Sequence, residues 1–283
     1  MEPLSGITGH SWRHNNIKAG DKFRLWLMSD LHLGSSATNE QRIKQELDEA
    51  VEDGARILIN GDVIDGILPK DPRFRPSVLV EELLGRDDLI NYTVEYLVNF
   101  FEPYVKNIDE MSDGNHELSI VSHNSCDILG MVVKLLNMKH GTDIKHGSYI
   151  GFITYLFTWI GTTTTISYRG FRSHGRANSA PVTKGLIEFN RLAEGVEGVD
   201  FIWVGHSHDV TMHPISRIFP DRNGNPRYRE QWNIRTGGYF QHSKGSYPVN
   251  KGLLPKPHGG AGIGLTFYTQ RGASPNYRVR VSK

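Results

Sequence analysis

With 283 residues and 38% apolar content, the chain is long enough for one large or two ordinary domains with a substantial core. Its 32 basic and 31 acidic residues leave a formal net charge of +1, which excludes a whole-molecule field attracting nucleic acid or an anionic membrane. The single cysteine, Cys126, excludes an internal disulfide and suits a reducing cytoplasm.

Two segments bear on targeting. Residues 1–20 contain no apolar run of the signal-peptide kind, so export by that route is not expected. Residues 149–160 form the most apolar stretch, but it falls short of the roughly 20 residues that a membrane-spanning helix needs. We therefore expect a cytoplasmic protein that makes no use of a membrane.

A strand–helix–strand unit is predicted first. Residues 23–28 and 55–59 are apolar runs typical of buried strands. Between them, residues 39–52 place apolar side chains on one helical face, as a helix covering a sheet requires. Thr38, followed three residues later by Gln41, predicts a capping box at the start of this helix.

The next segments complete the first half. Residues 67–76 are rich in proline and charge, which predicts a surface loop near the site. Residues 78–101 are predicted to be helical, and a short strand is expected before Gly114. A further helix is expected over residues 127–137.

The second half is richer in strand. The predicted strands are residues 148–160, 163–168, 170–173 and 199–204. A helix carrying Leu186, Phe189 and Leu192 is expected before the last of them. Residues 210–235 are predicted to form a β-hairpin near the active site, because Asn223-Gly224 lies between two strand-like runs.

No linker or internal repeat divides the chain, so we expect a single domain over residues 1–283. Its fold class is predicted as α/β, a four-layer αββα sandwich of two mixed sheets flanked by helices.

Five short polar motifs carry the chemistry. In chain order they are Asp30-Leu31-His32, Gly61-Asp62-Val63-Ile64-Asp65, Gly114-Asn115-His116-Glu117, His174-Gly175 and Gly205-His206-Ser207-His208. The first, second and fifth directly follow apolar runs, which places them at the carboxyl ends of strands, where open α/β folds build active sites. Each motif alone is more typical of an ordinary turn, but five in this order indicate a site for two metal ions.

The residue types suit hydrolysis of a phosphate ester. Two metal ions can neutralise phosphoryl oxygens and generate hydroxide at neutral pH. Asp62 is the natural bridging carboxylate, since it lies between Asp30 and His32 and the ligands supplied later in the chain. Neutral imidazoles and one carboxamide complete the ligand set without added negative charge. These are His174, His206, His208 and Asn115.

In order and residue type, the motifs resemble those of the calcineurin-like metallophosphoesterases, also called binuclear metallophosphatases, over residues 25–209. The resemblance implies that one metal is bound by Asp30, His32, Asp62 and His208. It implies that the other is bound by Asp62, Asn115, His174 and His206. A metal-bridging hydroxide would then attack the phosphorus, and His116 would contact the phosphate and protonate the leaving group. Asp65 and Glu117 would orient ligand imidazoles or His116.

A narrower resemblance concerns residues 172–175, followed by a helix and the last motif. This arrangement is most similar to small metallophosphoesterases encoded by bacteriophages and prophages, a resemblance that implies a bacterial cell.

Two differences from other branches of the family inform the substrate. Asp65 is followed by Gly66-Ile67, where the protein phosphatases carry a phosphate-binding arginine. His116 stands where a branch that cleaves a lipid-linked pyrophosphate carries arginine. A nucleotide or nucleic-acid phosphodiester is therefore the expected substrate. A phosphomonoesterase acting on a small metabolite, and a non-catalytic interaction module retaining the fold, are the alternatives.

The ligand set of oxygen and nitrogen donors suits manganese, iron, zinc or nickel, and manganese is our working expectation. His174 has the shortest motif, and its rivals as a ligand are His123, His140 and His146. The other histidines, His10, His14, His213, His242 and His258, are expected at the surface or in packing.

Two groups near the carboxyl-terminal part have both a functional and a structural interpretation. Arginines of the predicted hairpin could grip the substrate, or simply form a solvated face. They are Arg217, Arg222, Arg227 and Arg229. Tyr239, Phe240 and Tyr247 could stack on a base, but core packing is the expected role.

Overall fold

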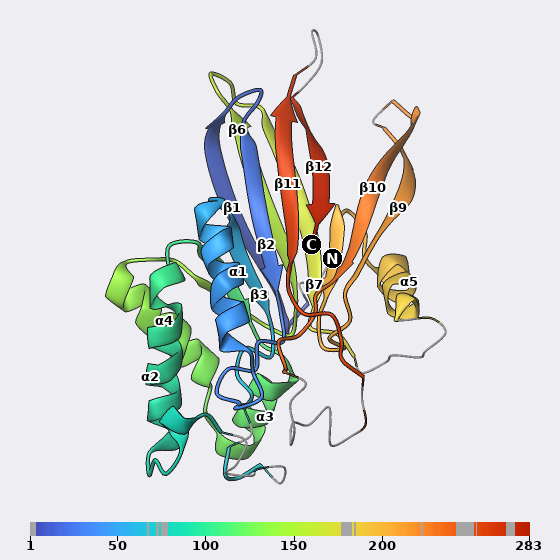
Figure 1. Cartoon of the computed structure of the whole chain (residues 1–283). Coiled ribbons are helices and arrows are strands. Elements are labelled where there is room, and N and C mark those ends of the chain that lie inside the picture. The colour runs from blue at the N-terminus through green and yellow to red at the C-terminus, as the bar shows by residue number, and fades with distance from the viewer. Residues whose placement is uncertain are drawn as a thin grey trace.

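The computed structural model describes residues 4–66, 68–71, 74, 79–176, 183, 185–221, 223–241, 252, 254–269 and 275–283. Two six-stranded mixed sheets lie face to face, and helices cover their outer faces (Figure 1). The predicted fold class is therefore confirmed. No helix in the described ranges is both long and apolar enough to cross a membrane.

One sheet has the strand order β12-β11-β2-β3-β4-β5. Its strands are β2 (Lys22–Met28), β3 (Arg56–Asn60), β4 (Ile108–Ser112), β5 (Lys145–Gly147), β11 (Ala261–Tyr268) and β12 (Asn276–Ser282). β2 to β5 are parallel, whereas β11 runs antiparallel to β2 and β12. The carboxyl ends of β2, β3 and β4 therefore meet at one edge.

The other sheet has the order β1-β6-β7-β8-β10-β9. Its strands are β1 (Ile7–Ile17), β6 (Ile150–Trp159), β7 (Thr165–Ser173), β8 (Phe201–Val204), β9 (Thr211–Pro220) and β10 (Pro226–Arg235). β7, β8 and β10 are parallel neighbours, and β9 pairs with β10 as the antiparallel hairpin predicted around Asn223-Gly224.

Successive side chains of a strand point to opposite faces of its sheet, and the two sheets therefore contribute to three hydrophobic cores. In β3, Ile57 and Ile59 face the helical layer, whereas Leu58 faces the other sheet. In β8, Phe201 and Trp203 face the space between the sheets, whereas Ile202 packs beneath the helix beyond. Strands buried on both faces need continuous apolar runs, which explains why these segments contain no polar alternation.

The α-helices of the described chain are α1 (Glu40–Glu52), α2 (Leu89–Phe101), α3 (Asn115–Asn124), α4 (Ile128–His140) and α5 (Leu186–Gly195). α1, α2 and α4 lie on one side of the paired sheets and α5 lies on the other (Figure 1). α3 lies beyond the carboxyl ends of the strands.

Several predicted boundaries were wrong. α1 is capped by Asn39, whose side chain accepts a hydrogen bond from the Arg42 backbone N–H, and Thr38 instead donates to the His32 carbonyl. The helix predicted from residue 78 begins at Leu89, because Asp88 caps it and only a 3₁₀ turn, η2 (Glu81–Leu83), precedes it.

The predicted strands were incomplete. The strands predicted at 163–168 and 170–173 are one strand, β7. β1, β11 and β12 were not predicted, since β1 and β11 pair with strands far away in the sequence, and β1 and β12 are edge strands with polar exposed faces. Half of the predicted loop 67–76 lies outside the described residues.

A buried ion pair joins the two sheets. Arg172 on β7 donates to the Glu110 carboxylate on β4, and each side chain is 1% exposed. The guanidinium also donates to the Ser148 carbonyl and to Thr8 Oγ1, while His10 Nδ1 lies 2.6 Å from the second Glu110 oxygen. Such a pair is tolerated in a core only because hydrogen bonds satisfy the remaining polar atoms.

Candidate metal centre

The polar motifs follow strand ends at one edge of the sandwich. Asp30 and His32 come after β2, Asp62 after β3, Asn115 after β4, and His174 after β7. The last two histidines, His206 and His208, follow β8. Six of the seven predicted ligands form two neighbouring groups, and the seventh, Asn115, contacts His174, as the predicted strand ends require.

The first group of candidate ligands contains Asp30, His32 and His208. His32 Nε2 lies 3.3 Å from His208 Nε2, and His208 Nε2 lies 3.4 Å from Asp30 Oδ1. Asp30 and His32 are buried, whereas the His208 side chain is 22% exposed. One carboxylate and two imidazoles converging at these distances can hold a divalent ion.

The second group contains Asp62, His174 and His206. His174 Nε2 lies 3.1 Å from Asp62 Oδ2 and 3.3 Å from His206 Nδ1. The same nitrogen lies 3.2 Å from Asn115 Oδ1, so the carboxamide belongs to this group as well. The His174 side chain, at the centre of this second group, is fully buried.

Asp62 stands between the two groups. Its Oδ2 lies 3.1 Å from His174 Nε2 and 3.8 Å from His32 Nε2, while Oδ1 accepts a hydrogen bond from the His116 backbone N–H at 2.9 Å. Burial raises the pKa of this carboxyl, but the His174 imidazole and its neighbours outweigh burial and hold the pKa well below the usual value. An ionised carboxylate facing both groups is the geometry that a bridging ligand needs.

Protonation of His174 opposes metal binding in the metal-free protein. Burial lowers the pKa of His174, but the adjacent Asp62 carboxylate raises it more, to about 10. A metal ion requires the neutral imidazole, so binding at the second group must release this proton. Metal affinity at this group is therefore expected to rise with pH.

Backbone strain is concentrated at the site. Within the described part of the chain, seven non-glycine residues have positive φ, and five of them are Asp30, His32, Asp62, His206 and His208. Such conformations are costly and persist only where the surroundings determine them. Gly61, with a φ of +75°, must be glycine, because a Cβ would overlap Nδ1 of the His174 ring and would lie 2.7 Å from the Gly114 Cα.

His116 lies beside the first group without joining the seven ligands. Its ring packs edge-on against His32, with ring centroids 4.7 Å apart, and its Nδ1 contacts the Asp65 carbonyl. Burial lowers the pKa of His116, but Asp62 and Asp65 raise it more, so the net shift is upward. Asp65 Oδ1 also lies 3.5 Å from His32 Nδ1 and 3.8 Å from His116 Nδ1.

Glu117 has a different role from the one predicted. Its carboxylate accepts hydrogen bonds from three backbone N–H groups, those of Asp62 at 2.9 Å, Ile64 at 3.0 Å and Gly114 at 2.7 Å. It therefore holds together the loops that carry Asp62 and Asn115, rather than orienting an imidazole. Burial and the Asp62 charge raise the pKa of Glu117 to about 7.

Glu117→Gln is expected to lower the free energy of unfolding by about 1–3 kcal/mol, since at least one buried N–H would then face an amide donor. Urea unfolding of the metal-free protein measures the loss. Glu52→Gln, at an exposed position of α1, is the control and should change stability by less than about 0.5 kcal/mol. Equal stability of the two variants would contradict this role for Glu117.

Two rival histidines of His174 have partners elsewhere. His140 Nε2 lies 3.1 Å from Glu102, and His146 Nε2 lies 2.9 Å from Asp113. Asp113, Asp127 and His146 form a further group with converging donor atoms, but Asp127 is already the N-cap of α4.

The hairpin arginines do not reach the metal-binding groups. β10 pairs with β8 only from Trp232 to Arg235, so the hairpin turn extends past the amino end of β8 (Figure 1). Arg217 donates to the Ala193 carbonyl, Arg227 to Asp221, and Arg229 lies 3.9 Å from Asp200. Their predicted substrate contact is therefore wrong, and Arg222 lies outside the described residues.

Two aromatic side chains at the site were not predicted to contact ligands. Tyr149 packs edge-on against His174 at 5.3 Å and donates to the Gly175 carbonyl. Phe240 stacks on His32 at 4.4 Å. No local sequence pattern identifies either contact, because each aromatic residue comes from a distant part of the chain.

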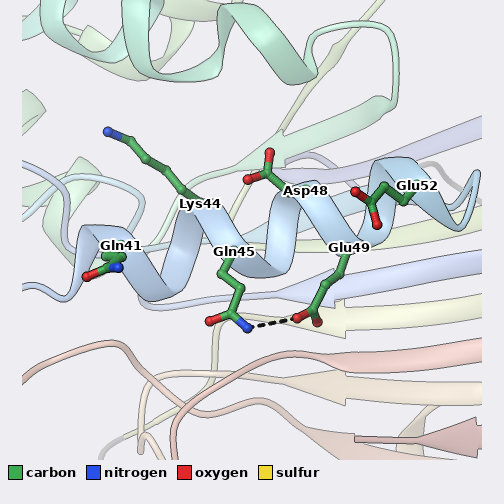
Figure 2. Close-up of a pocket in the computed structure, with 6 residues that line it drawn as sticks. All are labelled: Gln41, Lys44, Gln45, Asp48, Glu49 and Glu52. Atoms are coloured by element: carbon green, nitrogen blue, oxygen red, sulfur yellow. Dashed lines mark hydrogen bonds between the residues drawn. The ribbon is translucent and has the colours of Figure 1, made fainter.

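A polar pocket lies along the outer face of α1 (Figure 2). Its lining side chains are Gln41, Lys44, Gln45, Asp48, Glu49 and Glu52. Three carboxylates against one lysine would repel a phosphate ester, and Gln45 already donates to Glu49 at 3.0 Å. This pocket is therefore no competitor of the metal centre for such a substrate.

Two mixed sheets in a four-layer sandwich, with aspartates and histidines converging at the strand ends, are the features of the calcineurin-like metallophosphoesterase fold expected from the sequence. No family model matches the chain, and no curated protein matches it either. Similar solved structures include a conserved uncharacterized protein and predicted phosphoesterase from Streptococcus pneumoniae, with 11% identity and a TM-score of 0.33, covering 92% of this chain and 99% of that one.

Two further structures have similar scores. Vps29 from Chaetomium thermophilum has 11% identity and a TM-score of 0.34, with 92% of this chain and 95% of that one covered. GAP50 of Plasmodium, an anchor in the inner membrane complex, has 12% identity and a TM-score of 0.37, with 88% and 82% covered. Similarities at this level support no conclusion about activity, which must rest on the geometry of the site.

Proposed function

We propose that this protein is a phosphodiesterase that uses two divalent metal ions, with manganese as the first ion to test and iron, zinc or nickel as the others. The single observation that carries the proposal is the position of Asp62, whose Oδ2 faces His174 at 3.1 Å and His32 at 3.8 Å. One carboxylate shared by two groups of nitrogen and oxygen donors suits a pair of ions better than a single one.

Each side chain then has a defined task. Asp30, His32, Asp62 and His208 would hold one ion, and Asp62, Asn115, His174 and His206 the other. Bound ions would supply Lewis-acid stabilisation of the phosphoryl oxygens and an activated water. His116 would contact the phosphate and give a proton to the leaving oxygen, a role that its raised pKa favours at neutral pH.

A nucleotide or nucleic-acid diester is the proposed substrate class. The support is the glycine after Asp65, where an arginine would grip a terminal phosphate in the protein phosphatases. This chain has no arginine clamp at that position. A singly charged diester suits such a site better than a monoester does, because its phosphate needs less charge neutralisation by the protein.

The test compares two esters after the protein has been stripped of metal and reloaded with manganese. We expect bis-p-nitrophenyl phosphate to be cleaved with a kcat/KM at least about tenfold above that for p-nitrophenyl phosphate, equivalent to roughly 1.4 kcal/mol at the transition state. The stripped protein should be inactive with both. Preference for the monoester would contradict the diester assignment, and failure to cleave either ester with any of the four metals would contradict the enzymatic one.

A further inference from the structure

We infer that residues 236–241, here called the strap, position the two imidazoles of the first metal-binding group. The strap leaves the end of β10 and crosses the site edge toward the start of α1. This inference rests on the proposed binding of two metal ions. It assigns to one short segment the orientation of His32 and His208, which come from opposite sheets.

The strap is anchored at both ends by hydrogen bonds. Thr236 Oγ1 accepts from the Trp203 indole at 3.0 Å and lies 2.6 Å from Ser29 Oγ, which itself bonds to Asp30. At the other end, the Gln241 N–H donates to the Ala37 carbonyl at 2.6 Å. A segment tied to both sheets in this way can transmit its position to the ligands beside it.

Tyr239 adds a buried anchor in the middle of the strap. Its ring is fully buried, and its hydroxyl donates to Glu46 Oε2 at 2.6 Å. The same oxygen of Glu46 accepts from the Gly260 N–H at 2.9 Å. Because these hydrogen bonds hold Tyr239 in place, its sequence neighbours Gly238 and Phe240 are fixed against the metal-binding histidines.

Gly238 lies directly behind the His208 imidazole. A Cβ at this position would overlap Nδ1 and would lie 2.8 Å from Cγ of that ring. Real Cβ atoms essentially never come so close, so any larger residue must displace either the strap or the imidazole. The absence of a side chain at Gly238 thus sets how far His208 can rotate away from Asp30.

Phe240 covers both imidazoles of the first group. Its ring stacks on His32 with 4.4 Å between centroids and 20° between planes, and on His208 with 5.6 Å and 25°. The two imidazole centroids are only 5.2 Å apart, so both must lie against the same face of the Phe240 ring. One aromatic surface therefore restricts the tilt of two ligands at once.

The second group is independent of this device. In the described chain, no hydrogen bond or ring contact joins the strap to Asn115, His174 or His206. Changes in the strap should therefore weaken one metal site and spare the other. Outer groups of this kind typically contribute about 10–100-fold to metal affinity.

The experiment measures binding of manganese chloride to the stripped protein by calorimetry, with electron paramagnetic resonance to detect a coupled metal pair. Wild-type protein should bind two ions per chain and give the coupled signal. Gly238→Ala and Phe240→Leu should each lower the affinity of one site about 10–100-fold, leaving one tight ion and an uncoupled signal. Phe240→Tyr keeps the stacked ring and should bind two.

Matched controls separate this effect from general destabilisation. Gly264→Ala has room for its Cβ, with the nearest atom 3.9 Å away, and Phe219→Leu alters an exposed ring on the hairpin. Both should bind two ions like the wild type. If Gly238→Ala fails to fold, Phe240→Leu still tests the inference, since that ring is partly exposed.

The outcomes distinguish the inference from the proposed function. Two tight ions in both Gly238→Ala and Phe240→Leu would overturn the role of the strap and leave the proposed function intact. Equal weakening of both sites would also overturn it, because the second group does not contact the strap. If the wild type itself binds fewer than two ions of manganese, iron, zinc or nickel, the two-metal site fails, and the inference fails with it.

Discussion

Asp62→Asn is expected to reduce manganese-dependent cleavage of bis-p-nitrophenyl phosphate by at least about 10³-fold, because Lewis-acid stabilisation and water activation would be impaired together. In the native site, Oδ1 accepts from the His116 backbone N–H, and only Oδ2 faces His32 and His174. The asparagine oxygen would keep the first hydrogen bond, so its NH₂ group would point at both metal positions. Steady-state kinetics with the reloaded protein measures the loss.

Asp143→Asn is the matched control for this variant. Asp143 has an 84% exposed side chain and pairs with Lys145 on the surface. Its replacement should leave kcat/KM within about twofold of the wild type, as expected for a change away from the site. If Asp62→Asn kept more than a tenth of the wild-type activity, a bridging role for this carboxylate would be untenable.

Arg172→Met is expected to lower the free energy of unfolding by about 3–5 kcal/mol, because it leaves the fully buried Glu110 carboxylate without its main partner. Removing the guanidinium also takes this donor from the Ser148 carbonyl and leaves Thr8 Oγ1 with Ser148 as its donor, so the contact between β4, β7 and β1 loosens. Urea unfolding of the metal-free protein is the measurement.

Two further variants interpret the result. Arg24→Met removes an exposed pair with Asp53, whose side chains are 40% and 64% exposed, and should cost no more than about 1 kcal/mol. Adding Glu110→Leu to Arg172→Met removes the orphaned charge and should restore part of the stability. A double variant less stable than Arg172→Met would show that Glu110 does not depend on this arginine.

The elements that local pattern determines were predicted well. β3 and β8 are largely apolar and buried on both faces, β2 is apolar from Leu25 onward, and each ends where polar residues begin. Because parallel strands of such folds end at a common edge, the seven ligands could be predicted to lie close together. They lie together in the structure. Asn223-Gly224 likewise identified the β9–β10 hairpin from turn chemistry alone.

The failures share a different cause. The direction of the hairpin depends on its register with β8, and that register sends Arg217, Arg227 and Arg229 away from the site. The family resemblance assigned Glu117 to ligand imidazoles or His116, yet its position at the start of α3 directs it to backbone N–H groups. Neither fact is encoded in the spacing of residues along the chain.

By itself, the sequence determined the types of ligand, their order and the strands that carry them, since strand formation and strand ends follow from alternation and composition over a few residues. Only the tertiary structure decided which ligands face one another across Asp62, that Glu117 holds the loops, and that Phe240 stacks on His32. Those contacts join residues at least 55 positions apart in the sequence, which is the separation of Asp62 and Glu117. They form only when crossover connections and strand register bring the two sheets together in one sandwich.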